Sequence, residues 1–149
     1  MLGQCIFCEI VAGRAPASVV HQDETFMAFM DIYPWRPGHV LVIPKVHAQY
    51  VHELAMDTRR ELFALGSRIA EAVRASAIPC DDVHFLINDG PAANQTVGHV
   101  HLHVLPRRRG DLWRAALALC QRPFVTLMGQ APRATLDHQA EQIRHHLRE

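Results

Sequence analysis

The sequence predicts an α+β domain in which one long helix covers a five-stranded antiparallel sheet, with a short helix near each end of the chain. Three observations lead to this fold class. Short apolar segments alternate with turn-forming residues, one long segment has apolar residues at helical spacing, and an amphipathic stretch ends the chain. Strands joined by short turns favour antiparallel pairing, and a helix with a single apolar stripe covers one face of such a sheet.

The first half of the chain supplies the short N-terminal helix and three strands. Ile6, Phe7 and Ile10 recur at helical spacing, and Gly13 ends that segment. Residues 31–38 are rich in turn formers, and Pro34 favours a turn there because its ring fixes φ. The expected elements are a helix over residues 5–12, strands near 18–22, over 25–30 and over 39–43, and a loop over 31–38 before the third strand.

The second half of the chain supplies the main helix and two further strands. Aliphatic residues recur at spacings of 3, 4 and 4 from Leu62 to Val73, which gives one apolar stripe. Thr58 and Glu61 match a capping box and predict the helix start. The expected elements are a helix over about 57–77, a strand over 83–88, a loop over 89–96, a strand over 99–105, a helix from Asp111 to Cys120 and a helix after Thr135.

Length and composition restrict the class of protein. The 149 residues suit one domain with a core of its own. Lys+Arg and Asp+Glu both number 15, so no global basic field gathers nucleic acid. No apolar run approaches the roughly 20 residues of a membrane helix, and no secretory signal precedes the four cysteines. We expect a soluble cytoplasmic protein with reduced or metal-bound thiols and neither nucleic acid nor membrane as a partner.

Three histidines mark the last expected strand. His99, His101 and His103 alternate with aliphatic residues, so on a strand their imidazoles share one face. An imidazole near neutral pH is a metal ligand, a general acid or base, or a nucleophile. The alternative is an edge strand with a solvated polar face, which more often uses Thr, Lys, Glu or Ser. The row therefore favours a functional site.

The histidine row and several other blocks resemble the histidine triad (HIT) family of nucleotide hydrolases and transferases. The pattern His-φ-His-φ-His-φ-φ, with φ apolar, is the family signature. The other matching blocks are Cys5-Ile6-Phe7-Cys8-Glu9-Ile10, Pro37-Gly38-His39-Val40-Leu41-Val42-Ile43-Pro44-Lys45, Asn88-Asp89-Gly90 and Gln95-Thr96-Val97. The resemblance implies a HIT-like fold over residues 1–110, and it leaves 111–149 as a C-terminal extension packed on the same domain or on a dimer partner.

The resemblance also implies catalytic roles. His101 would attack the α-phosphorus and become a nucleotidyl-histidine, with the backbone carbonyl of His99 holding its other ring nitrogen. His103 and His39 would donate hydrogen bonds to the phosphate oxygens, where the transferred charge lies. Taken alone, His39 fits a satisfied structural histidine on an apolar strand.

The nucleotide site implied by the resemblance has three parts. Asp31 matches the residue that binds the ribose hydroxyls, although an Asp that starts a turn explains it as well. Asn94 stands where many relatives have Gly, and Asn tolerates the left-handed conformation that such a loop needs. The apolar base pocket would be formed by Ile6, Phe7, Ile10, Phe29 and Ile32, each of which also fits a core residue, and the phosphate donors would be Asn88, Asn94, Gln95 and Thr96.

The cysteine spacing points to a metal. Cys5 and Cys8 form the Cys-x-x-Cys bite of two thiolate ligands, and by resemblance His47 and His99 complete a zinc site. Four ligands with no open position make a structural zinc. The alternative is a pair of buried thiols without metal, since some relatives lack these cysteines.

Substrate class follows from the branch that the chain resembles. Family transferases carry Gln where this chain has His103, so His103 favours hydrolysis. The run 106–111 looks closer to the dinucleoside polyphosphate hydrolases, and a Trp-Pro-Pro-Gly-like tail typical of phosphoramidases is absent from the sequence.

We expect a homodimer that cleaves adenosine-containing dinucleoside polyphosphates. The alternatives are an AMP-amine phosphoramidase and a non-catalytic, zinc-stabilised nucleotide-binding module. Arg107-Arg108-Arg109 would contact a distal phosphate or form a solvated charge run.

Overall fold

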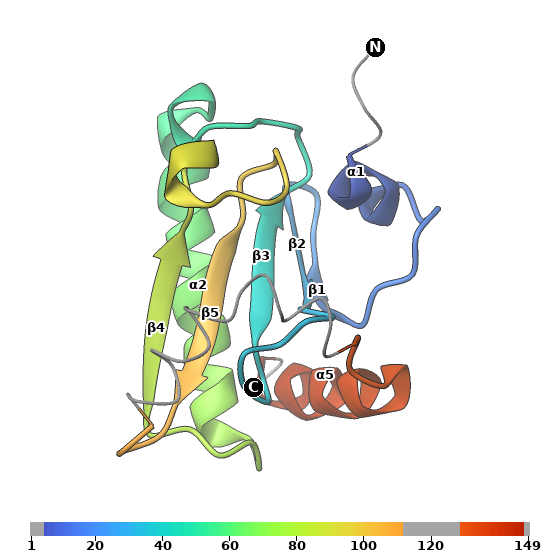
Figure 1. Ribbon diagram of the computed structural model, residues 1–149, viewed down its shortest axis with the longest axis vertical. Helices are drawn as coiled ribbons and strands as arrows, with labels where there is room; N and C mark the ends of the chain where they lie inside the picture. Colours follow the sequence, from blue (N-terminus) through green and yellow to red (C-terminus); the bar gives the residue numbers. More distant parts are fainter. Residues whose placement is uncertain (1–4, 112–128, 148–149) are drawn as a thin grey trace.

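The computed structural model describes residues 5–111 and 129–147, and it confirms the α+β prediction (Figure 1). The strands are β1 (Val19–Gln22), β2 (Phe26–Met30), β3 (Val40–Pro44), β4 (Asp82–Ile87) and β5 (Leu102–Arg107). The helices are α1 (Ile6–Val11), α2 (Met56–Ala75) and α5 (Arg133–Leu147), with 3-10 turns η1 (Val51–Glu53) and η2 (Pro91–Ala93).

The five strands form one antiparallel sheet in the order β1-β2-β3-β5-β4. The chain leaves β3 and crosses one face as α2, so β4 becomes an edge and β5 inserts beside β3 (Figure 1). Leu41 of β3 pairs with His103 of β5. The histidine strand therefore lies inside the sheet, between β3 and the edge strand β4, and two neighbours fix its backbone.

The two faces of the sheet have separate cores because side chains alternate along each strand. Val40 and Val42 face α2 and α5, whereas Leu41 and Ile43 face α1. His103 pairs with Leu41 and therefore shares the α1 face. The core on that face consists of Phe7, Ile10, Met27, Phe29, Leu41 and Ile43.

Helix α2 lies very close to β5. A Cβ atom on Gly66 would come within 2.4 Å of Leu102 Cδ2, so any larger residue there would force the Leu102 side chain to move. Leu102 and Val104 fill the α2 side of β5 and are 2% and 0% exposed. The prediction that the aliphatic residues between the histidines pack on the opposite face is confirmed.

The predicted capping box is wrong. Helix α2 begins at Met56 with Ala55 as its N-cap and no side-chain cap, so Thr58 already lies inside the first turn. The chain is instead turned just before the helix, where the Glu53 carboxylate accepts hydrogen bonds from the N–H groups of Gln49 and Tyr50, at 2.7 and 2.9 Å. The Glu53 carboxylate therefore closes η1, the 3-10 turn that precedes the helix.

The histidine strand is shorter at its start than the sequence predicts. β5 begins at Leu102, so His99 and His101 precede the regular ladder. The reason is that hydrogen bonds outside the ladder hold this segment: Val100 N–H donates to Ala48 O at 2.8 Å, and the His99 ring bonds the carbonyl of Pro44. The predicted helix from Asp111 to Cys120 falls almost wholly outside the described residues.

Helix α5 packs against α2, β1 and β2 and contributes to the core on the α2 side. Leu136, Ala140 and Ile143 are 1%, 1% and 0% exposed. Burial of one helix face explains the amphipathic spacing at the end of the chain. Among the described residues, no helix combines the length and hydropathy needed to span a bilayer.

Candidate active site and metal centre

His99 and His101 are each held by a main-chain carbonyl. His101 Nδ1 donates to the carbonyl oxygen of His99 at 2.7 Å, and His99 Nε2 donates to that of Pro44 at 2.8 Å. A carbonyl oxygen only accepts, so the bonded nitrogen must carry the proton. Neutral His101 therefore has its lone pair on Nε2, and neutral His99 has its lone pair on Nδ1.

His39 and His103 are held by each other. His39 Nε2 lies 3.0 Å from His103 Nδ1, and both side chains are buried. The Trp35 main-chain N–H donates to His39 Nδ1 at 3.3 Å, so His39 carries its proton on Nε2 and donates it to His103. Neutral His103 then carries its own proton on Nε2. Its ring centroid lies 4.8 Å from that of His101, so the two imidazoles are direct neighbours.

Asp31 starts a turn, as one of its two sequence interpretations expects, and its carboxylate also lies near His39. Its Oδ1 accepts the N–H of Tyr33 at 2.9 Å, which makes it the first residue of a turn. Its Oδ2 lies 3.5 Å from His39 Nδ1, at the edge of the histidine row. The loop between β2 and β3 therefore delivers a carboxylate to the site.

The structure brings three of the five residues of the predicted base pocket together. Phe7 contacts His101 edge-on with ring centroids 5.3 Å apart, and it meets Phe29 at 5.5 Å. Ile10 belongs to the same cluster. Ile32, in contrast, packs against the core on the α2 side, and Ile6 is 48% exposed.

The loop after β4 has the compact shape expected from its small residues. Asn94 adopts a left-handed conformation with φ 66°, as predicted. Asn88 Nδ2 donates to the carbonyl of Asn94 at 3.3 Å, and the Gln95 side chain bonds Gly90 N–H and Gln49 O at 3.1 and 2.8 Å. The amides of Asn88 and Gln95 thus brace the loop itself. Thr96 is exposed at its end.

The four predicted metal ligands converge beside α1. Their ligand atoms lie within 4.8 Å of one another. Cys5 Sγ is 3.5 Å from His99 Nδ1, and Cys8 Sγ is 3.3 Å from His47 Nδ1 and 3.7 Å from His99 Nδ1. Bonds of about 2.3 Å to sulfur and 2.0 Å to nitrogen give a sulfur–nitrogen edge of about 3.5 Å in a tetrahedral zinc site. The residues present therefore fit zinc.

His99 connects the metal cluster to the histidine row. Its Nδ1 faces the two thiols, its Nε2–H is held by Pro44, and its carbonyl oxygen orients His101. Burial lowers the pKa of the His99 imidazole below its ordinary value, which keeps the ring neutral and its Nδ1 able to coordinate. Burial also raises the pKa of the Cys8 thiol, an effect that a bound cation would oppose.

The basic run after the histidines is not uniformly solvated. Arg107 is 7% exposed and donates from Nε to both oxygens of Asp111 at 3.1 and 3.2 Å, and from a terminal nitrogen to His84 Nδ1 at 2.9 Å. The interpretation of a charge run on the surface is therefore wrong for Arg107, because Asp111 pairs with it. Arg108 and Arg109 are exposed.

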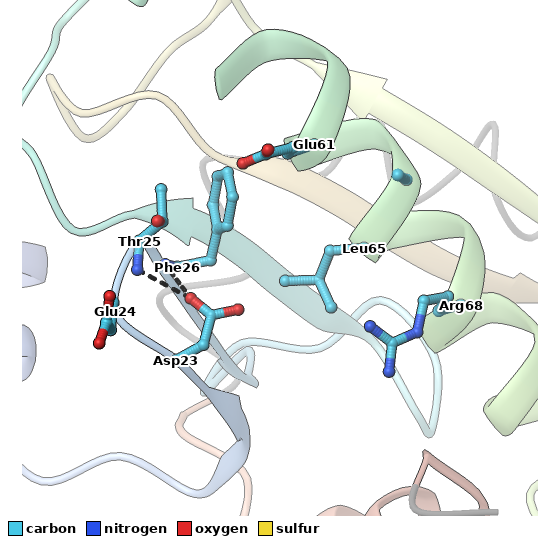
Figure 2. Close-up of a pocket in the computed structure, with 8 residues that line it drawn as sticks. Asp23, Glu24, Thr25, Phe26, Glu61, Leu65 and Arg68 are labelled. Carbon is cyan, nitrogen blue, oxygen red and sulfur yellow. Dashed lines mark hydrogen bonds between the residues drawn. The ribbon is translucent and has the colours of Figure 1, made fainter. Parts of the chain in front are cut away.

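A separate pocket lies on the α2 side of the sheet, between the β1–β2 turn and α2 (Figure 2). It has a volume of about 410 Å³ and contains none of the residues that the sequence predicts for the site. Its lining includes Asp23, Glu24, Thr25, Phe26, Glu61, Leu65 and Arg68. The β1–β2 turn there is closed by Asp23 Oδ1, which accepts the N–H groups of Thr25 and Phe26.

Sequence reasoning missed two groups that contact the histidines. Trp35 stacks beside His103 with ring centroids 6.4 Å apart and 25° between the planes. The Pro44 carbonyl anchors His99. Neither has a spacing pattern that could reveal it, since Trp35 lies in an irregular loop and a carbonyl is present at every residue.

Comparison with known proteins agrees with this architecture. A sequence model of the HIT domain matches residues 12–110. An uncharacterized HIT-like protein of Mycobacterium tuberculosis is 45% identical over 118 residues, which are 79% of this chain and 81% of that protein. The adenosine 5'-monophosphoramidase hnt1 of Schizosaccharomyces pombe is 37% identical over 103 residues, 69% of this chain and 74% of that protein.

A solved structure extends the similarity to nearly the whole chain. The crystal structure of a Zn-bound histidine triad family protein from Mycobacterium smegmatis has a TM-score of 0.80 at 38% identity and covers 97% of this chain and 94% of that one. The fold and the histidine row thus define a histidine triad protein. The chain belongs to the HIT domain family, as the sequence resemblance implied.

Proposed function

We propose that the protein is a nucleotide hydrolase that cleaves at an α-phosphate through a nucleotidyl-histidine on His101. The observation that carries the proposal is the 2.7 Å hydrogen bond from His101 Nδ1 to the His99 carbonyl, which fixes the lone pair on Nε2. A neutral imidazole held in that tautomer is a nucleophile at neutral pH.

The reaction has two steps. His101 Nε2 attacks the α-phosphorus, and the bond to the leaving group breaks. That group takes the proton on His103 Nε2 while His103 Nδ1 takes the proton on His39 Nε2, so in this step the pair must carry one additional proton, on His39 Nδ1 beside the Asp31 carboxylate. Water then attacks the phosphorus, the bond to His101 breaks, and the water proton returns to His103. His39 supports both transfers because its Nε2 bonds His103 Nδ1 at 3.0 Å.

The nucleotide half of the substrate is proposed to lie between α1 and the histidine row. Phe7 and Phe29 offer an apolar surface to a base, and Asp31 offers a carboxylate to the ribose hydroxyls. The loop with Asn88 and Thr96 offers donors to the phosphate. Ile10 belongs to the same apolar cluster, whereas Ile6 is exposed and Ile32 packs on the α2 side, so these two are left out of the proposed site. Gln95 and Asn94 shape the loop.

An amine is the leaving group that the comparisons favour. The named relative from Schizosaccharomyces pombe is an adenosine 5'-monophosphoramidase, and an amine departs only with a proton such as that on His103. The second candidate is a dinucleoside polyphosphate, which the exposed Arg108 and Arg109 support because guanidinium groups bind phosphate. Buried Arg107 no longer supports it.

We also propose that Cys5, Cys8, His47 and His99 hold a structural zinc. The donor set is the Cys₂His₂ set that zinc prefers, and the similar protein from Mycobacterium smegmatis is Zn-bound. The ion would tie α1 to the segment before β5. It leaves the chemistry of phosphoryl transfer to the histidines.

A homodimer is proposed from the exposed apolar edge. Within the described residues β4 pairs only with β5, and Leu86 and Ile87 on it are 37% and 39% exposed. Phe63 of α2 is 55% exposed and contacts Phe85 with ring centroids 5.2 Å apart and the planes tilted by 52°. A second copy would cover both the strand edge and these side chains. A monomer mass in sedimentation equilibrium would contradict the dimer.

Mass spectrometry after mixing with substrate tests the proposed function. Wild type, His101→Ala and a surface control, His138→Ala, are each incubated with adenosine 5'-phosphoramidate or diadenosine tetraphosphate. We expect an AMP-sized adduct on wild type and the control only, with faster turnover of the phosphoramidate. Faster turnover of the dinucleotide selects the second candidate. AMP binding without adduct or turnover indicates a non-catalytic binding module and overturns the proposal.

A further inference from the structure

The segment just before and within α5 holds both ends of the loop that separates Asp31 from His39. At the Asp31 end, Ala131 N–H donates to the carbonyl of Ile32 at 2.9 Å. At the His39 end, Gly38 N–H donates to Gln139 Oε1 at 3.0 Å. Both contacts join residues about a hundred positions apart, and the family model ends at residue 110.

Helix α5 is a firm support for these contacts. Its buried face packs in the core on the α2 side, and two polar contacts fix it to the region of β1. Ser18 donates to Asp137 at 2.6 Å, and Arg144 donates to the carbonyl of Val19 at 2.7 Å. A side chain mounted on this helix therefore has a defined position relative to the sheet.

Gly38 needs this support because its backbone is unusual. Its φ is +82°, and a Cβ atom would lie 2.8 Å from Ile78 Cγ2, so the loop takes a conformation that only glycine allows here. Gly38 is buried, and a buried N–H requires an acceptor. Gln139 supplies that acceptor one residue before His39.

We propose that Gln139 is a positioning residue for the His39–His103 pair. The path runs from Gln139 Oε1 to Gly38 N–H, then through the adjacent peptide to His39, and from His39 Nε2 to His103 Nδ1. The inference rests on the proposed function, in which His103 protonates the leaving group. Gln139 acts on proton transfer, and the main-chain contact at Ile32 maintains the Asp31 side of the loop.

The test compares Gln139→Leu, which keeps the size and removes the acceptor, with Gln139→Glu, which restores an acceptor. His138→Ala on the exposed face of α5 is the matched control. For adenosine 5'-phosphoramidate we expect kcat to fall about tenfold in Gln139→Leu with KM within about twofold, since a misplaced proton donor slows the chemical step. Gln139→Glu and the control should stay within about twofold of wild type.

Hydrogen–deuterium exchange gives a second measurement that does not depend on turnover. The peptide covering residues 31–39 should exchange faster in Gln139→Leu alone, with melting temperatures compared in parallel. Unchanged kcat, an equal loss in Gln139→Glu, or unchanged exchange overturns the proposal. If wild type shows no turnover while the peptide 31–39 still exchanges faster in Gln139→Leu than in wild type, the result contradicts the proposed function alone. Gln139→Ala serves if Gln139→Leu does not fold.

Discussion

The two ends of the histidine strand are held by opposite means. At its start, the rings of His99 and His101 are fixed by carbonyl oxygens at 2.8 and 2.7 Å. At its end, Arg107 and Asp111 form a buried ion pair. Carbonyl acceptors select one tautomer and keep a nitrogen lone pair for chemistry or metal binding, whereas an ion pair provides stability that depends on pH.

Near the start of the strand, the tautomers of the His39–His103 pair are less constrained than those of the two rings held by carbonyls. Each member of the pair can donate or accept, and the Asp31 carboxylate lies 3.5 Å from His39 Nδ1. A second proton on His39 would face that carboxylate. The pair is therefore suited to proton transfer, and the rings held by carbonyls are suited to nucleophilic attack and coordination.

The largest expected effect tests whether the pair acts as one unit. We expect His39→Ala and His103→Ala each to lower kcat about 100-fold, the range of general acid catalysis, because either change removes the donor arrangement. The double variant should lose about as much as each single variant, since partners in one network are not additive. Steady-state kinetics on adenosine 5'-phosphoramidate checks this.

The control for that cycle is the exposed His138→Ala variant on α5, which should leave kcat unchanged. A double variant whose losses multiply to about 10,000-fold would show that the two histidines act independently. That result would remove the distinction between the paired rings and the rings held by carbonyls.

A smaller effect is expected from the metal. His47→Ala removes an exposed ligand but keeps the Pro44 bond to His99 and the His99 carbonyl. We expect bound zinc to be lost and the melting temperature to fall, while kcat falls less than about tenfold because the nucleophile keeps its acceptor. Metal analysis, thermal melts with and without chelator, and kinetics measure these three results.

The matched control for the metal is His52→Ala, an exposed histidine outside the cluster. Chelator should lower the melting temperature of wild type and this control but not of His47→Ala. Equal chelator sensitivity in all three proteins would contradict the assigned ligand set. A loss of kcat as large as that of His101→Ala would show that the carbonyl alone does not orient the nucleophile.

The sequence predicts what local periodicity encodes. Alternation in the strands gave the two faces of the sheet, and the i, i+2, i+4 row placed His103 on the α1 face with His101 beside it. The Cys-x-x-Cys bite with His47 and His99 became a cluster whose ligand atoms lie within 4.8 Å. Family resemblance, rather than spacing, selected those two histidines.

Contacts that depend on tertiary pairing were not predictable. Gln139 meets Gly38 across 101 positions of sequence, and no local pattern specifies such a pair. Arg107 looked like one member of a charged run because nothing in the sequence shows that Asp111 turns back to pair with it. The early start of α2 was missed because the helix begins without a side-chain cap, and no local sequence pattern marks such a start.

The smallest effect is expected at the far end of β5 and concerns stability. The Arg107 guanidinium holds the pKa of the Asp111 carboxyl below its ordinary value, helped by Arg108 N–H and by Arg36, whose Nε lies 3.4 Å away. A depressed folded-state pKa contributes stability above the ordinary value of about 3.9 and loses it as pH falls through the folded value. Asp111→Asn should therefore cost about 3 kcal/mol at pH 7, because it leaves buried Arg107 unpaired, and progressively less in acid. Urea unfolding of wild type and variant between pH 7 and about pH 3 measures the difference.

The control is Asp81→Asn, which changes an exposed carboxylate that accepts Arg109 N–H at 3.0 Å. A difference that is constant with pH would show that Asp111 acts through shape and hydrogen bonding rather than charge, and the contrast between the two ends of β5 would then lose its electrostatic basis.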